Sequence, residues 1–131
     1  MPQVSVLIVE DDWFCGEALK LDLEQMGHRV IGVAQTGAAA LEVLMLQRPD
    51  LVFVDTELGA ETSEMVVDEC RLQRIPTVIC SGHAASQLPA FCAGLQAISK
   101  PYMLQHLADT LRRIVPTHRA EAGEPIRPPT P

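Results

Sequence analysis

Acidic side chains stand at the ends of two apolar runs that lie far apart in the sequence. "VSVLIVEDD" runs into Glu10, Asp11 and Asp12, and "LVFVD" ends on Asp55. A short apolar run bounded by charge predicts a buried strand, so these acids would mark strand ends. In neighbouring parallel strands, about 5 Å apart, Asp11 and Asp55 could share one cation, with Glu10 bound directly or through water. A few oxygen ligands that leave room for water suit Mg²⁺ better than Ca²⁺ or zinc.

Two further residues could serve a phosphoryl group beside that cation. Ser81 follows the apolar run from Thr77 to Cys80, and Lys100 follows the run from Ala97 to Ile98. The Asp55 carboxylate can accept a phosphoryl group, Lys100 can neutralise the transferred oxygens, and Ser81 can donate a hydrogen bond to them. The sequence therefore predicts a phosphoryl acceptor at Asp55 with Mg²⁺ as its cofactor.

Strand and helix patterns alternate along the chain, which would bring these residues together. The expected strands are Val4 to Val9, Val30 to Ala34, Leu51 to Val54, Thr77 to Cys80 and Ala97 to Ile98, and the expected helices are Phe14 to Met26, Gly37 to Gln47, Ser63 to Arg74 and Met103 to Val115. Continuous apolar strands separated by helices predict a parallel sheet covered on both faces. The expected fold class is α/β, a flavodoxin-like (βα)5 doubly wound five-stranded sheet of strand order 2-1-3-4-5. Its switch point lies between the first and third strands, where the acids meet.

Two segments depart from this alternation. The stretch between Ser81 and Ala97 is rich in Ala, Ser and Gly and contains Pro89, so we expect the fourth helix to be short or irregular. After Val115, five of 16 residues are proline and almost no apolar side chain remains. The expected organisation is one domain over residues 1–115 and a Pro-rich disordered tail over residues 116–131.

Composition and charge argue against several classes of protein. The chain has 131 residues, about one domain, and no apolar run near the roughly 18 residues of a membrane helix. A net charge of -7 with scattered basic residues gives no electrostatic footprint for nucleic acid. The N-terminus lacks the features of a signal peptide, and four cysteines without CxxC spacing predict reduced thiols. We therefore expect a cytoplasmic protein that binds neither membrane nor nucleic acid.

The chain resembles the receiver domain of two-component response regulators from residue 4 to about residue 115. The matching stretches are "VLIVEDD", "LVFVD", "TVICSG" and "ISKP", in the family's order. The resemblance implies roles for five side chains: Glu10 and Asp11 as the acidic pair, Asp55 as the phospho-acceptor, Ser81 as the switch hydroxyl and Lys100 as the family's lysine. It also implies that the backbone carbonyl of Glu57 is a metal ligand and that the peptide bond from Lys100 to Pro101 is cis.

Three places depart from the family's pattern. After Asp55 the chain reads "DTELGAETSE", with Gly59 where the family usually has proline, so we expect a looser and more acidic loop. Ala97 stands at the aromatic switch position, three residues before Lys100. The interval from Ser81 to Lys100 is shorter than in typical receivers. Dimerisation through the surface of the fourth helix, fifth strand and last helix is therefore not expected.

The resemblance implies a single-domain response regulator in a two-component phosphorelay. Asp55 would accept a phosphoryl group from a histidine kinase or phosphotransfer protein, and the output would be contact with a downstream protein or drainage of phosphate. Such a chain is a phosphoryl acceptor rather than a turnover enzyme. The alternative is a pseudo-receiver, an interaction module independent of phosphorylation, because Ala97 cannot act as an aromatic switch. An aspartyl-phosphate phosphohydrolase is disfavoured, since the chain is short for a substrate cap and lacks a D-x-D pattern after its first strand.

Two residues near the expected site have both a plain and a functional interpretation. Trp13, the only tryptophan, is expected at the rim as a partly exposed first residue of a helix, with kinase contact as the alternative. His83 is expected to be a solvated loop residue, with control of dephosphorylation as the alternative. Glu57, beside the acceptor, could repel or orient an attacking water.

Overall fold

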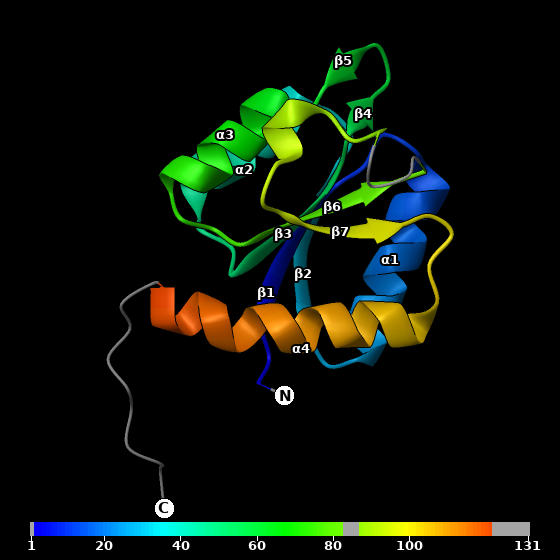
Figure 1. The fold of residues 1–131 in the computed structure, drawn as a ribbon, viewed down its shortest axis with the longest axis vertical. Coiled ribbons are helices and arrows are strands. Elements are labelled where there is room, and N and C mark those ends of the chain that lie inside the picture. The colour runs from blue at the N-terminus through cyan, green and yellow to red at the C-terminus, as the bar shows by residue number, and fades with distance from the viewer. Residues whose placement is uncertain (1, 83–86, 122–131) are drawn as a thin grey trace, which may run out of the picture.

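A five-stranded parallel sheet forms the middle layer of the molecule (Figure 1). The structure is a computed structural model and describes residues 2–82 and 87–121. The strands of this sheet are β1 (Ser5–Val9), β2 (Arg29–Ala34), β3 (Leu51–Asp55), β6 (Thr77–Ser81) and β7 (Gln96–Ser99). They lie in the order β2-β1-β3-β6-β7, with every neighbouring pair parallel. The predicted fold class and strand order are confirmed, and the switch point lies between β1 and β3.

Helices cover both faces of the sheet. On one face lie α1 (Trp13–Gln25) and α4 (Leu104–Glu121), and on the other lie α2 (Gly37–Leu46) and α3 (Glu64–Leu72) (Figure 1). Side chains of β1 alternate between the two faces, so Val6 and Ile8 join the core cluster under α1 and α4 while Leu7 and Val9 join the cluster under α2 and α3. The sheet thus separates two apolar cores that share its strands.

Local sequence signals set the ends of the helices that flank the acids. The Asp12 side chain accepts a hydrogen bond from the Cys15 amide at 3.0 Å and caps the start of α1. Gly27 follows α1 with φ of +93°, a conformation that glycine adopts readily and that ends the helix. Asp12 therefore directs the chain from the end of β1 into α1, which leaves Glu10 and Asp11 at the edge of the sheet.

In place of a fourth α-helix, the described residues between β6 and β7 form the 3₁₀ turn η2 (Ala90–Cys92), in agreement with the short or irregular helix that the sequence predicts. The Arg71 guanidinium on α3 donates hydrogen bonds to the carbonyls of Phe91 and Ala93, each at 2.9 Å. One side chain thus attaches this short segment to the neighbouring helix.

Two local predictions are wrong. The last helix was expected to end at Val115, where the Pro-rich stretch begins, but α4 continues to Glu121. The remaining tail, residues 122–131, lies outside the described residues. The acidic loop after Asp55 was expected to be loose, but it contains an antiparallel hairpin, β4 (Glu57–Leu58) and β5 (Glu61–Thr62). Gly59, with φ of +66°, supplies the backbone conformation that its two-residue turn needs.

The described helices include none that is both long and apolar enough to cross a membrane. The cysteines are free, with Cys15 exposed and Cys70, Cys80 and Cys92 buried.

Candidate functional site

Three carboxylates meet at the carboxyl ends of β1 and β3. These strands are neighbours, with Val9 opposite Val54, so Glu10 and Asp11 emerge beside Asp55. One oxygen from each of the three acids lies within 4.8 Å of the others. Glu10 is only 6% exposed, whereas Asp11 is exposed and Asp55 lies between these extremes. An all-oxygen cluster of this spacing fits a hard divalent cation.

Lys100 reaches the same point from β7. Ser81 pairs with Ser99 across β6 and β7, and the Lys100 amide donates to the Ser81 carbonyl at 2.8 Å, which places the lysine just beyond the strand end. Its Nζ donates to Asp55 Oδ2 at 2.7 Å and also forms an ion pair with Glu10. The predicted cis peptide bond between Lys100 and Pro101 is present.

Negative charge exceeds positive charge where these side chains meet. Burial raises the pKa of Glu10 to about 7, against the hydrogen bond from Lys100, and Asp55 adds to the rise. Burial alone would lower the pKa of Lys100, but Asp55 and Glu10 outweigh it and raise that pKa, so the ammonium stays charged. Two carboxylates thus share one ammonium, with Asp11 beside them. A divalent cation would offset the remaining negative charge.

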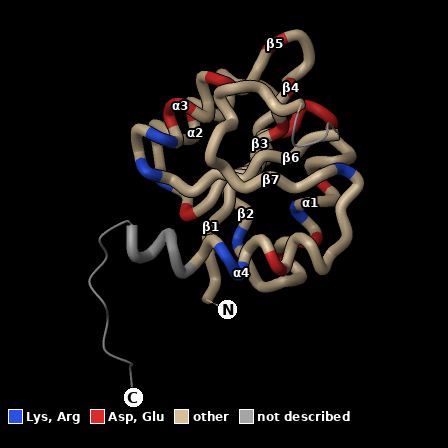
Figure 2. The backbone as a smooth tube through the Cα atoms, viewed as in Figure 1, with Lys and Arg blue, Asp and Glu red and all other residues tan. Residues whose placement is uncertain are grey.

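Backbone amides of the β4–β5 hairpin orient two of the acids. The Glu57 amide donates to Asp55 Oδ1 at 3.1 Å, and the Gly59 amide donates to Asp11 Oδ2 at 2.9 Å. A hollow of about 270 Å³ opens here, lined by Asp11, Asp55, Thr56, Glu57, Gly59 and Gly82. Acidic segments lie on the hairpin and beside the end of β3 (Figure 2). The hollow therefore has room beside Asp55 and is bounded by acids and backbone amides.

The remaining residues that the sequence analysis singled out lie around the hollow or away from it. Ser81 ends β6 and is 3% exposed, but the neighbour that lines the hollow is Gly82. Ala97 lies on β7 with its side chain exposed. Trp13 begins α1 next to the acids and is 56% exposed, as expected for a rim residue. His83 lies outside the described residues.

Sequence reasoning missed Gly59 as part of the site. Its residue type was noted only as a departure from the family's pattern, yet its amide holds Asp11. One signal was available in the order Leu-Gly-Ala-Glu. A glycine at the first of two turn residues is typical of a tight hairpin.

Comparison with known proteins decides the family. A family model for the response regulator receiver domain matches residues 6–112. The chain belongs to this receiver family. Receivers bind Mg²⁺ at an acidic pocket, and the cluster of Glu10, Asp11 and Asp55 could hold such a metal.

Curated relatives of this receiver are response regulators. Sensory transduction protein LytT of Bacillus cereus is 32% identical over 114 residues, which is 84% of this chain and 46% of that protein. Transcriptional regulatory protein AfsQ1 of Streptomyces coelicolor is 37% identical over 76 residues, 57% of this chain and 33% of that protein. The receiver therefore spans less than half the length of these relatives.

Solved structures agree on the fold. The signal receiver domain of a modulated diguanylate cyclase from Desulfovibrio desulfuricans has a TM-score of 0.81 at 22% identity, covering 92% of this chain and 99% of that one. NtrX from Brucella abortus has a TM-score of 0.82 at 24% identity, covering 92% of this chain and 29% of that one. At these identities the likeness concerns the fold.

Proposed function

We propose that Asp55 accepts a phosphoryl group from a histidine kinase or phosphotransfer protein, in a reaction that requires Mg²⁺. The observation that carries this proposal is the contact of Lys100 Nζ with Asp55 Oδ2 at 2.7 Å, beside a hollow that Asp55 itself lines. A carboxylate held next to a fixed ammonium and open space has what a phosphoryl acceptor needs.

The transfer is a displacement at phosphorus. One Asp55 carboxylate oxygen forms a bond to phosphorus while the bond from phosphorus to the donor's imidazole nitrogen breaks, and that nitrogen keeps the electron pair. Lys100, already bonded to Asp55, lies where it can neutralise the oxygens of the arriving group. The Glu57 amide holds the other Asp55 oxygen in place.

The proposed metal ligands are Glu10, Asp11, Asp55 and the backbone carbonyl of Glu57. When bound, Mg²⁺ would neutralise negative charge on the phosphoryl oxygens and the carboxylates. Asp11 and Glu10 are already directed toward Asp55 by the Gly59 amide and by Lys100. Ser81, at the end of β6, is proposed to donate its hydroxyl to the phosphoryl group.

The output that we propose is a change in protein contact, or drainage of phosphate from a relay. A phosphoryl group on Asp55 would compete for Lys100, which now also holds Glu10. A new charge at this point therefore changes the pairing at the ends of β1, β3 and β7 together. A downstream protein that contacts this end of the sheet would meet a different surface.

A pseudo-receiver is the second candidate, favoured by Ala97. This exposed methyl group on β7 cannot swing inward as an aromatic ring would. In that case the partner surface would be the same with or without phosphate on Asp55.

Intact mass spectrometry tests the first proposal. After incubation with Mg²⁺ and acetyl phosphate, we expect the mass of one phosphoryl group on the native protein and on an Asp68→Asn control, which alters an exposed acid on α3. Asp55→Asn should gain nothing, because the nucleophile is gone. An unmodified native protein, or modification that persists in Asp55→Asn, contradicts the assignment.

Partner binding separates the two candidates. Proteins captured by the native receiver are compared in the presence and absence of beryllofluoride with Mg²⁺, which mimics the phosphorylated state. The response regulator is supported if beryllofluoride changes the affinity of a partner for the native protein but leaves its affinity for Asp55→Asn unchanged. Equal affinity in every arm supports the pseudo-receiver.

A further inference from the structure

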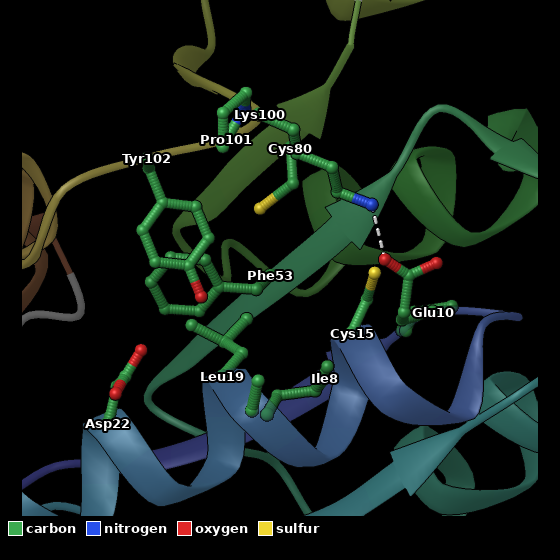
Figure 3. A pocket seen from close by; sticks show the side chains of 12 residues that line it. Ile8, Glu10, Cys15, Leu19, Asp22, Phe53, Cys80, Lys100, Pro101 and Tyr102 are labelled. Carbon is green, nitrogen blue, oxygen red and sulfur yellow. Dashed lines mark hydrogen bonds and ion pairs between the residues drawn. The ribbon is translucent and has the colours of Figure 1, made fainter.

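A second and larger cavity lies behind Lys100, away from the acidic hollow. It has a volume of about 430 Å³, in the range of pockets that hold small molecules. The strands form its floor through Ile8, Phe53 and Cys80, and α1 forms one wall. The connection from β7 to α4, with Pro101 and Tyr102, forms the other wall (Figure 3). Small residues on α1, Cys15 and Ala18, leave this space open.

The polar groups of the cavity lie at its two ends. Lys100 and Glu10 pair at one end, and Asp22 lies at the other (Figure 3). Tyr102 lies toward the Asp22 end (Figure 3), and burial, followed by the Asp22 carboxylate, raises the pKa of its phenol. Between these ends the lining is mostly apolar, so the cavity suits a molecule with an apolar body.

The Asp22 end of the cavity carries a negative charge that is not balanced by a cation. Within the part of the chain that the structure describes, Asp22 has no ion-pair or hydrogen-bond partner for its carboxylate. Lys100, the cation of the cavity, is already shared by Glu10 and Asp55. An occupant with a positive charge would complement Asp22, and the ring of Tyr102 could add a cation–π contact.

We propose that this cavity binds a small aromatic amine, with its ring system over Phe53 and its ammonium group at Asp22. The site is distinct from the acceptor hollow, because the two are lined by different residues. Lys100, which lines the cavity, contacts Asp55, which lines the hollow. Binding of the amine does not depend on the proposed function of Asp55.

Three indole compounds of similar size and different charge test the proposal. Tryptamine is cationic at neutral pH, tryptophol is neutral and indole-3-propionate is anionic. Dissociation constants are measured by NMR titration of the native protein. We expect tryptamine to bind about tenfold more tightly than tryptophol, because only tryptamine can form an ion pair with Asp22. Indole-3-propionate should bind least, because Asp22 repels its carboxylate.

Variants locate the binding site. Ala18→Phe places a ring at the cavity wall from a helix position whose side chain is exposed, and should abolish binding while the protein stays folded. Asp22→Asn should reduce tryptamine binding to the level of tryptophol. The matched controls Ala38→Phe on α2 and Asp68→Asn on α3 lie on the other face of the sheet and should change neither constant.

Labelling of Cys15 gives a second readout. It is the exposed cysteine and it lines the cavity, whereas the other three cysteines are buried. Bound tryptamine should slow its reaction with a thiol reagent, and Ala18→Phe should remove that protection. Failure of all three compounds to bind, equal affinity for the anion and the amine, or binding that survives Ala18→Phe would overturn the proposal.

Discussion

Among the residues that the structure describes, Lys100 is the side chain that forms ion pairs with both Asp55 and Glu10. Replacement by glutamine leaves a shorter polar side chain and removes the charge that faces the arriving phosphoryl oxygens. We expect Lys100→Gln to lower the rate of phosphorylation by acetyl phosphate by about tenfold or more, measured by intact mass over time. Lys20→Gln, on the body of α1, serves as control and should keep the native rate. A native rate in Lys100→Gln would show that the ammonium does not assist the transfer.

His28 makes the stability of the protein depend on pH. Its imidazole is buried and Nδ1 accepts a hydrogen bond from the Val4 amide at 3.2 Å, so the neutral form is favoured. Burial lowers the pKa of His28 below its usual 6.5. As pH falls, His28 is therefore protonated in the unfolded chain before it is protonated in the folded protein. The stability that neutral His28 provides is lost as pH falls through about 6.5 toward the folded pKa.

The measurement is the midpoint of urea unfolding at pH 7.5 and pH 5.5. Glu10, with its pKa raised to about 7, takes up a proton in the folded protein over the same range and acts in the opposite direction, so the readout is the difference between native protein and variant. His28→Gln should start less stable, and its stability at pH 5.5 relative to pH 7.5 should be more favourable than that of the native protein, because it no longer takes up the His28 proton. The same change in both proteins would assign the pH dependence to other groups.

The site residues that sequence analysis identified are those fixed by strand ends. Glu10, Asp11, Asp55 and Lys100 each follow an apolar run, and parallel pairing brings such positions together whatever the intervening loops do. Gly59 was missed because its contribution comes from a backbone amide, which every residue type except proline carries. Its position depends on a hairpin whose strands are two residues long, too short to show an apolar pattern, so the turn glycine was its one sequence signal.

Among the elements, the β4–β5 hairpin joins two parts of the molecule. On one side the Gly59 amide holds Asp11, and on the other Glu61 Oε1 accepts the Gly37 amide at 2.9 Å at the start of α2. A carboxylate at a helix N-terminus is favoured by the free amides and the helix dipole. Glu61 therefore fixes the hairpin to α2 although the loop is rich in acids.

Replacement of Glu61 by glutamine tests this attachment. The charge is lost and the hydrogen-bond acceptor is kept, so Glu61→Gln should lower the free energy of unfolding by about 0.5 kcal/mol at low salt and by less at high salt. Glu42→Gln, an exposed acid in the middle of α2, is the matched control. A loss of the same size in both variants, or one insensitive to salt, would argue against a specific role of Glu61.

At the scale of the whole molecule, the sheet should make the two cores unfold together. Leu111 on α4 and Leu44 on α2 are buried on opposite faces, and consecutive residues of β1 contribute to both cores. We expect Leu111→Ala and Leu44→Ala each to cost about 2–4 kcal/mol. Urea unfolding followed by far-UV circular dichroism and by amide exchange should show one transition in each variant. Separate transitions for the two faces would contradict this coupling.

The architecture was predictable because the alternation of strand and helix signals is repeated along the chain and parallel units combine in few ways. The end of α4 was not, because Pro116 is a strong local signal against helix and the chain nevertheless stays helical to Glu121. The large cavity was not predictable either. It depends on where Tyr102 and α1 lie relative to one another, and the sequence pattern carries no such distance.

The position of Trp13 provides a fluorescent probe of the acidic cluster. This residue is the only tryptophan in the chain, it follows the acidic cluster directly, and its indole is 56% exposed, with its ring edge-on to Phe14 at 5.2 Å between centroids. Indole emission responds to nearby charge and solvent. The protein therefore contains a single intrinsic fluorophore beside its acidic cluster, so that arrival of a cation can be followed optically without attaching a dye.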